Sequence, residues 1–254
     1  MNLPPRLEER LRDEHTPHAI AERLAAATRH SYLGDFVLGA VDGTGTTFAV
    51  VAGVAGAGMS SNVAIILGVA NLLADGFSMA VGNYLSTKAE QQIVDNVRRI
   101  EELHIEHHPA GEREEIRQIF AAKGFEGDLL DQIVEVITQN REQWVNTMVT
   151  EEFGLRIEHP QPLKAGLATF VAFVLAGAVP LLPLVVAPWF AELPMVTTFR
   201  ISALATGATF FLIGVAKGFV VDRSAWRSGL ETLGIGAVAA ALAYVVGHLF
   251  GSLR

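Results

Sequence analysis

The hydrophobic positions of this chain fall into long apolar runs that flank a stretch with a short helical period. Residues 165–191 contain no charged side chain, and residues 232–254 contain none before the terminal Arg254. A helix of about 20 residues crosses the ~30 Å of hydrocarbon in a bilayer, so each run is long enough. The shorter run 201–216 is bounded by Arg200 and Lys217, whose charged ends can extend toward the membrane surface. The C-terminal half therefore predicts three transmembrane helices.

Two earlier apolar runs, 34–58 and 62–85, contain acidic residues, namely Asp35, Asp42 and Asp75. We interpret both as spans, because their Gly, Ala and Thr content suits close helix packing and ionisable residues within a span usually face protein. Gly39 and Gly43, four residues apart, would let the first helices of two protomers approach closely. Five spans place the termini on opposite sides. Lys and Arg are enriched before span one, after span two and between spans four and five, which predicts that these segments are cytoplasmic.

Residues 87–162, between spans two and three, have a helical period of about 3.6 and a strong negative charge. They hold 16 Asp and Glu against 8 Lys and Arg, which accounts for the net charge of −8. We predict an all-α membrane protein with five transmembrane helices and a cytosolic helical metal-binding domain between spans two and three. Its parts are a cytosolic amphipathic segment at 1–31, spans one and two at 32–86, the acidic domain at 87–162, and spans three to five at 163–254.

The composition agrees with a membrane protein. Half of the residues are hydrophobic, 18% are charged and the mean hydropathy is +0.35, an apolar excess that a soluble domain could hardly cover. We expect the lipid bilayer as a partner, and no nucleic acid. The first uninterrupted apolar run begins only near Tyr32, after a charged stretch, so we expect no cleavable signal peptide. The absence of cysteine excludes disulfides and thiolate ligands.

The acidic residues of spans one and two are candidates for a cation path. Asp35 and Asp42 are seven residues apart on one helix face, and Asn71, Asp75 and Met79 follow each other at four-residue steps. A carboxylate deep in a membrane is costly unless it is protonated, paired or bound to a cation. Alternatively, Asn71 and Asp75 only hydrogen-bond a neighbouring helix and Met79 fills space. A carboxylate with a thioether suits iron(II) better than Mg²⁺ or Ca²⁺.

The acidic domain offers a second candidate site, because its acidic residues stand at helical spacing. Glu112 and Glu115 are three residues apart, and Met148 and Glu152 are four apart, so each pair shares a helix face. The candidate metal ligands are Glu101, Glu102, His104, Glu112, Glu115, Met148 and Glu152. They come from three helices that a short bundle would bring together. The alternatives are a solvated acidic face, and histidines that merely interact with a helix end.

Two motifs resemble a known family. The run GAVDGT at 39–44, continued by TTFAVVAG at 46–53, and the run ANLLADGFSMA at 70–80 with NYL at 83–85 are similar to the first two spans of the vacuolar iron transporter family. The resemblance extends from about Tyr32 over the rest of the chain. It implies a homodimeric five-span carrier that moves Fe²⁺, and sometimes Mn²⁺, out of the cytosol in exchange for protons. The path would run between the protomers, lined by spans one and two.

The resemblance also implies roles for individual residues. Asp42 and Met79 match the family's path positions, with Asp35 nearer the cytoplasmic entrance. The matching ligands of the cytosolic domain are Glu101, Glu112, Glu115, Met148 and Glu152. The chain departs from plant-like members at Asn71, where they have Glu, which leaves Asp75 as a possible substitute. It also departs at His104, which stands where an ungapped alignment places a second Glu of the first helix; a shift of one or two residues would bring in Glu102 and Glu106.

We therefore expect a proton-coupled exporter of Fe²⁺, not an enzyme, in which the acidic domain captures the ion and passes it to the membrane path. Mn²⁺, Co²⁺ and Zn²⁺ are further candidate ions. The expected location is a prokaryotic plasma membrane, with the N-terminus and residues 87–162 in the cytosol and the C-terminus on the opposite side. One alternative is a membrane-anchored, ferroxidase-like enzyme, although the Glu-x-x-His spacing occurs only once, at Glu101 and His104. Another is a metal-dependent interaction module.

Overall fold

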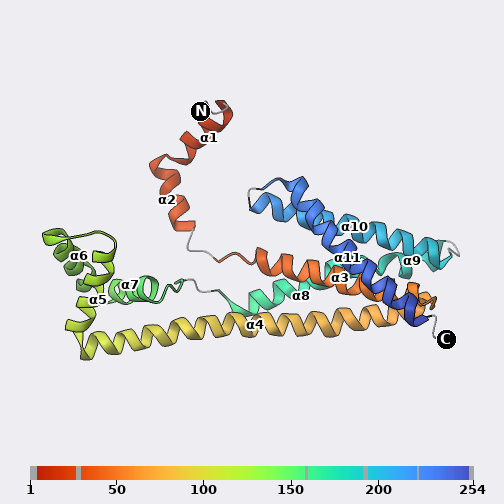
Figure 1. Ribbon diagram of the computed structural model, residues 1–254, viewed down its shortest axis with the longest axis horizontal. Helices are drawn as coiled ribbons and strands as arrows, with labels where there is room; N and C mark the ends of the chain where they lie inside the picture. The colour runs from red at the N-terminus through yellow and green to blue at the C-terminus, as the bar shows by residue number, and fades with distance from the viewer. Residues whose placement is uncertain (1–4, 27–29, 158–159, 191–193, 222, 252–254) are drawn as a thin grey trace. The chain divides into compact units, whose positions relative to one another are not determined.

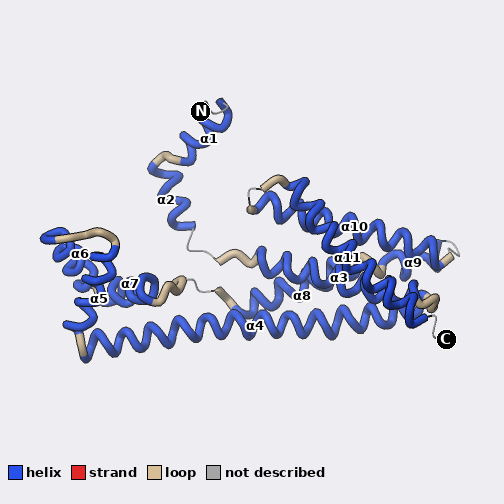
Figure 2. Tube along the Cα trace, viewed as in Figure 1, coloured by secondary structure: helices blue, strands red, loops and turns tan. Residues whose placement is uncertain are grey.

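The computed structural model describes residues 5–26, 30–157, 160–190, 194–221 and 223–251. All regular secondary structure in these ranges is helical (Figure 2), which confirms the predicted all-α class. The chain divides into two compact units. The first comprises Met1–His30 and Thr87–Pro160, and the second comprises Ser31–Ser86 and Gln161–Arg254.

The second unit contains the apolar helices. They are α3 (Leu33–Gly56), α4 (Ser61–His107, up to Ser86), α8 (Pro162–Ala178), α9 (Leu182–Phe190), α10 (Met195–Val220) and α11 (Ala225–Gly251). Four of them, α3, α4, α10 and α11, are long and apolar enough to cross a membrane. Helices α8 and α9 pass the same test together, as a pair bent by 44°. The described part of the chain thus has four such spans, or five if the bent pair forms one, in agreement with the predicted number.

The third predicted span, 165–191, is not one straight helix. Helix α8 ends at Ala178 and α9 begins at Leu182, while Ala191 lies outside the described residues. Pro180 falls in the break, where it has no N–H to donate and its ring conflicts with the preceding helical turn. Its own carbonyl accepts a hydrogen bond from the Ser202 hydroxyl at 2.6 Å. The bend is therefore fixed by a side chain of α10.

Small residues bring α3 and α8 into backbone contact (Figure 1). A Cβ atom at Gly39 would lie 2.2 Å from the carbonyl oxygen of Thr169, and one at Gly43 would lie 2.4 Å from that of Phe173. Both distances are far too short for any residue with a side chain. We expected these glycines to serve contact between two protomers, and that expectation was wrong, because they face α8 of their own chain.

The first unit has its own apolar core, which is formed by residues from Val94 onward. Its helices are α1 (Pro5–Glu14), α2 (Pro17–Ala26), α4 from Thr87 onward, α5 (Pro109–Ala122), α6 (Gly127–Gln139), α7 (Arg141–Thr147) and the π-helical turn η1 (Met148–Glu152). The core includes Ile116, Val134 and Trp144, all buried. Helix α4 continues past Ser86 into this unit, and the Asn140 side chain caps α7 by accepting a hydrogen bond from the Gln143 N–H at 3.1 Å.

Candidate functional site

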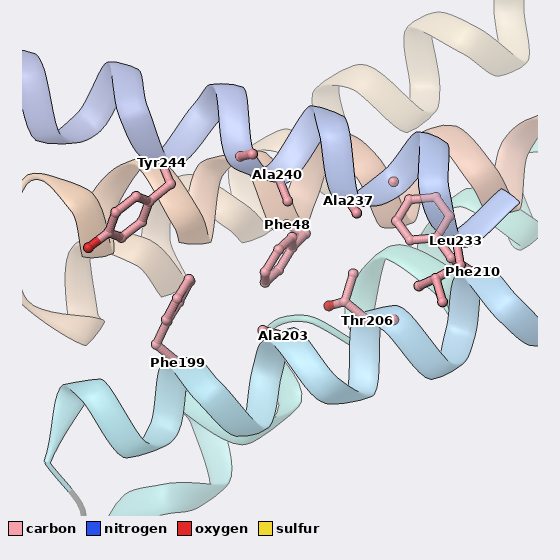
Figure 3. Close-up of a pocket in the computed structure, with 12 residues that line it drawn as sticks. Phe48, Phe199, Ala203, Thr206, Phe210, Leu233, Ala237, Ala240 and Tyr244 are labelled. Atoms are coloured by element: carbon pink, nitrogen blue, oxygen red, sulfur yellow. The ribbon is translucent and has the colours of Figure 1, made fainter. Parts of the chain in front are cut away.

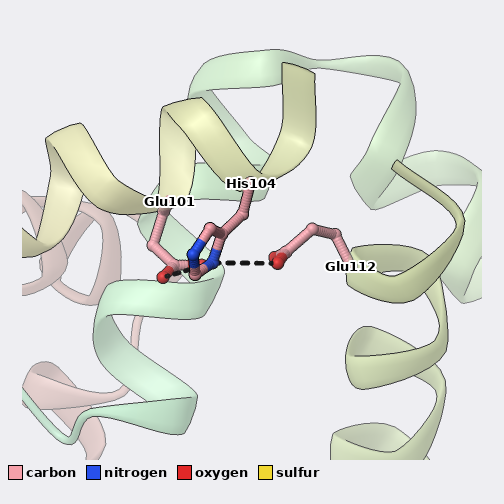
Figure 4. Close-up of side chains that lie close together, drawn as sticks. All are labelled: Glu101, His104 and Glu112. Carbon is pink, nitrogen blue, oxygen red and sulfur yellow. Dashed lines mark ion pairs between the residues drawn. The ribbon is translucent and has the colours of Figure 1, made fainter. Parts of the chain in front are cut away.

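Two carboxylates and an imidazole converge where α4 turns into α5. Helix α4 ends at His107 and α5 begins at Pro109, so the first turn of α5 comes back beside the last turns of α4. The Nδ1 atom of His104 lies 3.7 Å from a Glu101 oxygen and 3.3 Å from a Glu112 oxygen (Figure 4). One potential ligand atom from each residue falls within 4.8 Å of the other two. We call Glu101, His104 and Glu112 the carboxylate–histidine group.

Both carboxylates of this group are removed from water. Glu101 is 1% exposed and Glu112 is 3% exposed, whereas the His104 side chain is about half exposed. One oxygen of each carboxylate, Oε2, is buried without a hydrogen-bond partner among the described residues. Burial of a charged group without a partner is strongly unfavourable. A divalent cation would supply the missing positive charge, so the group fits a metal ion.

Two further carboxylates act on the same group electrostatically. Burial raises the pKa of the Glu101 carboxyl to about 7, and repulsion from Glu112 and Glu152 adds to the increase. Burial also raises the pKa of Glu112, with a contribution from Glu115, while Glu101 and His104 act in the opposite direction. The pKa of Glu152 is raised by burial and by Glu115 and Glu112. Four carboxylates thus repel one another in a small volume, as expected of a site built for a cation.

Met148 and Glu152 lie at the two ends of the π-helical turn. The Phe153 N–H donates to the Met148 carbonyl at 3.4 Å, five residues back instead of the usual four. Met148 is fully buried in the core cluster of the first unit. The same cluster contains Ile116, which lies one helical turn after Glu112 on α5. The sequence analysis paired Met148 with Glu152 but missed the π-helical turn. Such turns are rare in proteins overall, and those that occur are often at functional sites.

The structure does not place every predicted ligand in this region. The Glu102 side chain is exposed and lies outside the carboxylate–histidine group, and its backbone carbonyl accepts a hydrogen bond from Arg141 at 3.1 Å. Glu106 forms an ion pair with the same Arg141 at 3.7 Å. On α5 and α6, Arg113 and Glu135 form an ion pair at 3.0 Å on the surface, as the solvated-face alternative expects of exposed carboxylates.

The predicted path residues lie on α3 and α4. Asn83 donates a hydrogen bond to Asp35 at 2.8 Å, and Asn71 donates one to the Thr46 hydroxyl at 3.1 Å. From Asp35 to Thr46, α3 advances 11 residues, while α4 goes back 12 residues from Asn83 to Asn71. The two contacts therefore fit one antiparallel register. We call the residues on it, Asp35, Asp42, Thr46, Asn71, Asp75 and Asn83, the α3–α4 polar face.

This register brings two carboxylates together between the hydrogen-bonded ends of the polar face. Asp42 and Asp75 are both partly buried and near enough to repel each other electrostatically. Met79, one turn from Asp75, packs against the apolar cluster that contains Leu72 and Phe173. That contact agrees with the space-filling alternative for Met79. Asn71 makes the interhelical hydrogen bond that the alternative for this residue expected.

A separate cavity of about 430 Å³ lies among α3, α10 and α11 (Figure 3). Phe48 stacks on Phe199 with ring centroids 5.9 Å apart, and Phe199 stacks in turn on Tyr244 at 6.0 Å. The Thr206 hydroxyl in its wall already donates to the Ser202 carbonyl at 2.7 Å. The residues that line the cavity include neither a carboxylate nor a thioether, so it is not suited to a cation.

Comparison with known proteins extends these observations. A sequence model of the VIT family matches residues 33–248, from the start of α3 into α11 and including most of the first unit. The chain is 33% identical to the vacuolar iron transporter of Toxoplasma gondii, over 87% of this chain and 75% of that protein. It is 31% identical to vacuolar iron transporter 1 of Eucalyptus grandis over 93% and 91%, and 32% identical to that of Arabidopsis thaliana over 83% and 82%. These matches confirm the family that the sequence resembles.

Proposed function

Because this chain belongs to the VIT family, we propose that it is an integral membrane transporter that moves Fe²⁺ out of the cytosol. Its relatives are named as iron transporters and not as enzymes. The observation that carries the proposal is the α3–α4 polar face, on which Asp35, Asp42 and Asp75 lie within helices apolar enough to cross a membrane. Carboxylates in such a place mark an ion pathway.

The membrane stage of transport is assigned to Asp42, Asp75 and Met79. Two carboxylates that repel each other bind a divalent cation favourably, because the cation neutralises both. Protons from the far side compete with the ion for the same oxygens, and a neutral carboxylic acid is a much poorer ligand. Exchange of Fe²⁺ for protons follows from this competition. Asn71 lies at one end of this site on the polar face, and Asp35 lies at the other end.

The capture stage is assigned to the first unit, which we place in the cytosol. Glu101 and Glu112 hold the ion, with His104 as a nitrogen ligand and Met148 as a sulfur ligand. The further carboxylates of Glu115 and Glu152 add negative charge. A mixed oxygen, nitrogen and sulfur set favours borderline ions, so Fe²⁺ is the proposed cargo and Mn²⁺, Co²⁺ and Zn²⁺ are competitors.

We further propose a homodimer with the path at its centre. Ile66, Leu73 and Phe77 lie on α4 and are exposed in the single chain, so this face needs either lipid or a second protomer. A second copy would double the carboxylates along the path. The proposed location is a plasma membrane, with the C-terminus outside. The relatives are named for the vacuole. Transport across a plasma membrane or across a vacuolar membrane would in both cases remove Fe²⁺ from the cytosol.

The test is Fe²⁺ flux into sealed vesicles that contain the purified full-length protein. We expect the Fe²⁺ flux to increase when the vesicle interior is acidic. We expect Asp42→Asn to abolish this flux at equal protein content. Thr209→Val is a suitable control, because Thr209 is a partly buried residue of α10, away from the α3–α4 polar face, and its hydroxyl donates to the Ala205 carbonyl of the preceding turn at 2.9 Å. A Fe²⁺ flux equal to wild type in the Asp42→Asn variant would contradict the transport mechanism.

A further inference from the structure

One amide group on α4 holds three helices of the second unit together. The Nδ2 atom of Asn83 lies within hydrogen-bond distance of three acceptors, Asp35 Oδ1 at 2.8 Å, Thr169 Oγ1 at 2.7 Å and the Ala165 carbonyl at 3.2 Å, which share its two N–H groups. Thr169 is fully buried, and its hydroxyl lies 3.4 Å from the Asp35 carbonyl and 3.1 Å from the Ala165 carbonyl. Asn83 thus connects the Asp35 carboxylate of α3 to the backbone and side chains of α8.

The chemistry of this contact matters, because an amide orients a carboxylate without neutralising it. A Lys or Arg at the position of Asn83 would cancel the charge of Asp35. Asn83 instead engages one oxygen, Oδ1, and the other oxygen of Asp35, Oδ2, accepts no hydrogen bond within the described ranges. The carboxylate is held in one orientation with its negative charge and one oxygen still available to a ligand.

The position of the contact points the same way. Asn83 is four residues beyond Met79 and eight beyond Asp75, so it continues the stripe of α4 that carries both. Asp35 is two helical turns before Asp42 on the facing stripe of α3. The Asn83–Asp35 pair therefore closes one end of the α3–α4 polar face, directly next in line to the residues that would bind the ion.

We propose that Asn83 is a positioning residue for transport: it fixes the Asp35 carboxylate as the first ligand in the membrane spans that a divalent cation meets on the way to Asp42. This inference rests on the proposed function. A residue that only clamps helices would act through stability and protein amount. A residue that presents Asp35 acts on the concentration of ion needed for half-maximal flux, the apparent KM.

The test is a double-mutant cycle on the full-length protein in vesicles, with initial Fe²⁺ flux measured against Fe²⁺ concentration. Asn83→Leu keeps a similar volume and removes the donor, and Asp35→Ala removes the ligand. We expect each to raise the apparent KM about tenfold, and the double variant to be no worse than Asp35→Ala alone. Thr169→Val is the matched control. It loses one Asn83 contact and keeps the Asn83–Asp35 bond, so its apparent KM should stay within about twofold of wild type.

If Asn83→Leu does not fold, Asn83→Ser and Asn83→Ala replace it in the test. Asn83→Ser retains a hydroxyl donor, so its rise in apparent KM should be smaller than that of Asn83→Ala. Independent, multiplicative effects of Asn83 and Asp35 overturn the inference, as does an equal rise in KM for Thr169→Val. An unchanged apparent KM for Asp35→Ala also overturns the inference. In that case, a loss of Fe²⁺ flux in Asp42→Asn would still support the proposed transport function. Absence of Fe²⁺ flux in the wild-type protein refutes the proposed function itself.

Discussion

The imidazole Nδ1 of His104 lies 3.3 Å from the carboxylate of Glu112, across the turn that joins α4 to α5. Glu112 is almost completely buried, and one of its oxygens has no hydrogen-bond partner among the described residues. A protonated imidazole supplies part of the positive charge that this carboxylate lacks, and a neutral one supplies a nitrogen ligand. The same pair therefore serves the first unit both with and without a bound metal ion.

We predict that divalent metal stabilises the first unit and that Glu112 is central to this effect. An ion that binds only the folded state raises the melting temperature, and the rise grows with the logarithm of the ratio of ion concentration to Kd. Titration of the full-length protein in detergent with anaerobic Fe²⁺ should show this rise. Glu112→Gln should weaken the affinity about tenfold or more. Glu114→Gln is the control, because Glu114 is an exposed neighbour on α5 that pairs with Gln118 and Arg117 and lies outside the carboxylate–histidine group. Equal effects of the two substitutions would mean that the carboxylate–histidine group does not bind the ion.

We predict that the metal-free first unit loses stability as the pH rises from about 4.5 to about 7. The Glu101 carboxyl has its pKa raised from 4.5 to about 7 in the folded protein, so the folded state holds a proton there that the unfolded state has already released. Stability therefore falls with rising pH across this window, the reverse of the usual behaviour of a paired carboxylate. Metal affinity should rise over the same window, because the ion binds the deprotonated form.

Unfolding of this unit can be followed by the fluorescence of Trp144, which is buried in its core. Trp189 and Trp226 are exposed and can be replaced by Phe to leave a single reporter. Glu101→Gln removes the titration, and its melting temperature should vary much less between pH 4.5 and 7 in the presence of chelator. An identical pH profile in Glu101→Gln and the parent would contradict the assignment.

We predict that His104 influences which ion the first unit prefers. Imidazole suits Fe²⁺ and Zn²⁺, whereas an all-carboxylate set suits Mn²⁺. His104→Glu should therefore increase the affinity for Mn²⁺ relative to Zn²⁺, measured by competition titration. His107→Glu adds the same charge one turn away at an exposed position outside the carboxylate–histidine group, and it should leave the ratio unchanged. The same shift in both variants would mean that charge, and not ligation, sets the preference.

Much of this architecture follows from the order of apolar and polar residues. Uninterrupted apolar runs predicted the helices that can span a membrane, and the 3.6-residue period predicted the helical structure of residues 87–162. These features are local, because each depends on neighbours within one or two turns. The gathering of Glu101 with Glu112 could also be anticipated, since Pro109 forces the chain to turn between them.

The remaining features depend on contacts between distant segments. Sequence spacing alone did not tell Glu102 from Glu101, although one is exposed and the other buried, because the choice depends on how α5 packs against α4. The π-turn at Met148 has no sequence signal that we can identify. The partner of Gly39 and Gly43 was misassigned for a similar reason, because a small-residue motif shows that a helix approaches closely but not which helix.

We predict that α3 tolerates no side chain at Gly43. A Cβ there would meet the carbonyl oxygen of Phe173 at 2.4 Å, and backbone cannot move aside as a flexible side chain can. Gly43→Ala should destabilise the protein by about 1–3 kcal/mol or more, the usual cost of overpacking, and it should lower the melting temperature in detergent. Gly34→Ala is the control, because nothing lies within 4 Å of a Cβ at Gly34. Equal stability of both variants would show that α3 and α8 are not in backbone contact.

Our last prediction separates the two interpretations of Met79. Its side chain packs against the apolar cluster around Phe173, so Met79→Leu should preserve the packing and change stability little. The substitution removes only the thioether. If Met79 also binds the ion, Fe²⁺ flux into vesicles should decrease less than in Asp42→Asn, and the ratio of Fe²⁺ to Mn²⁺ transported should fall, because Mn²⁺ prefers oxygen ligands. The measurement is flux of the two ions in competition at matched protein content. An unchanged ratio would leave Met79 as a packing residue and assign the membrane site to Asp42 and Asp75 alone.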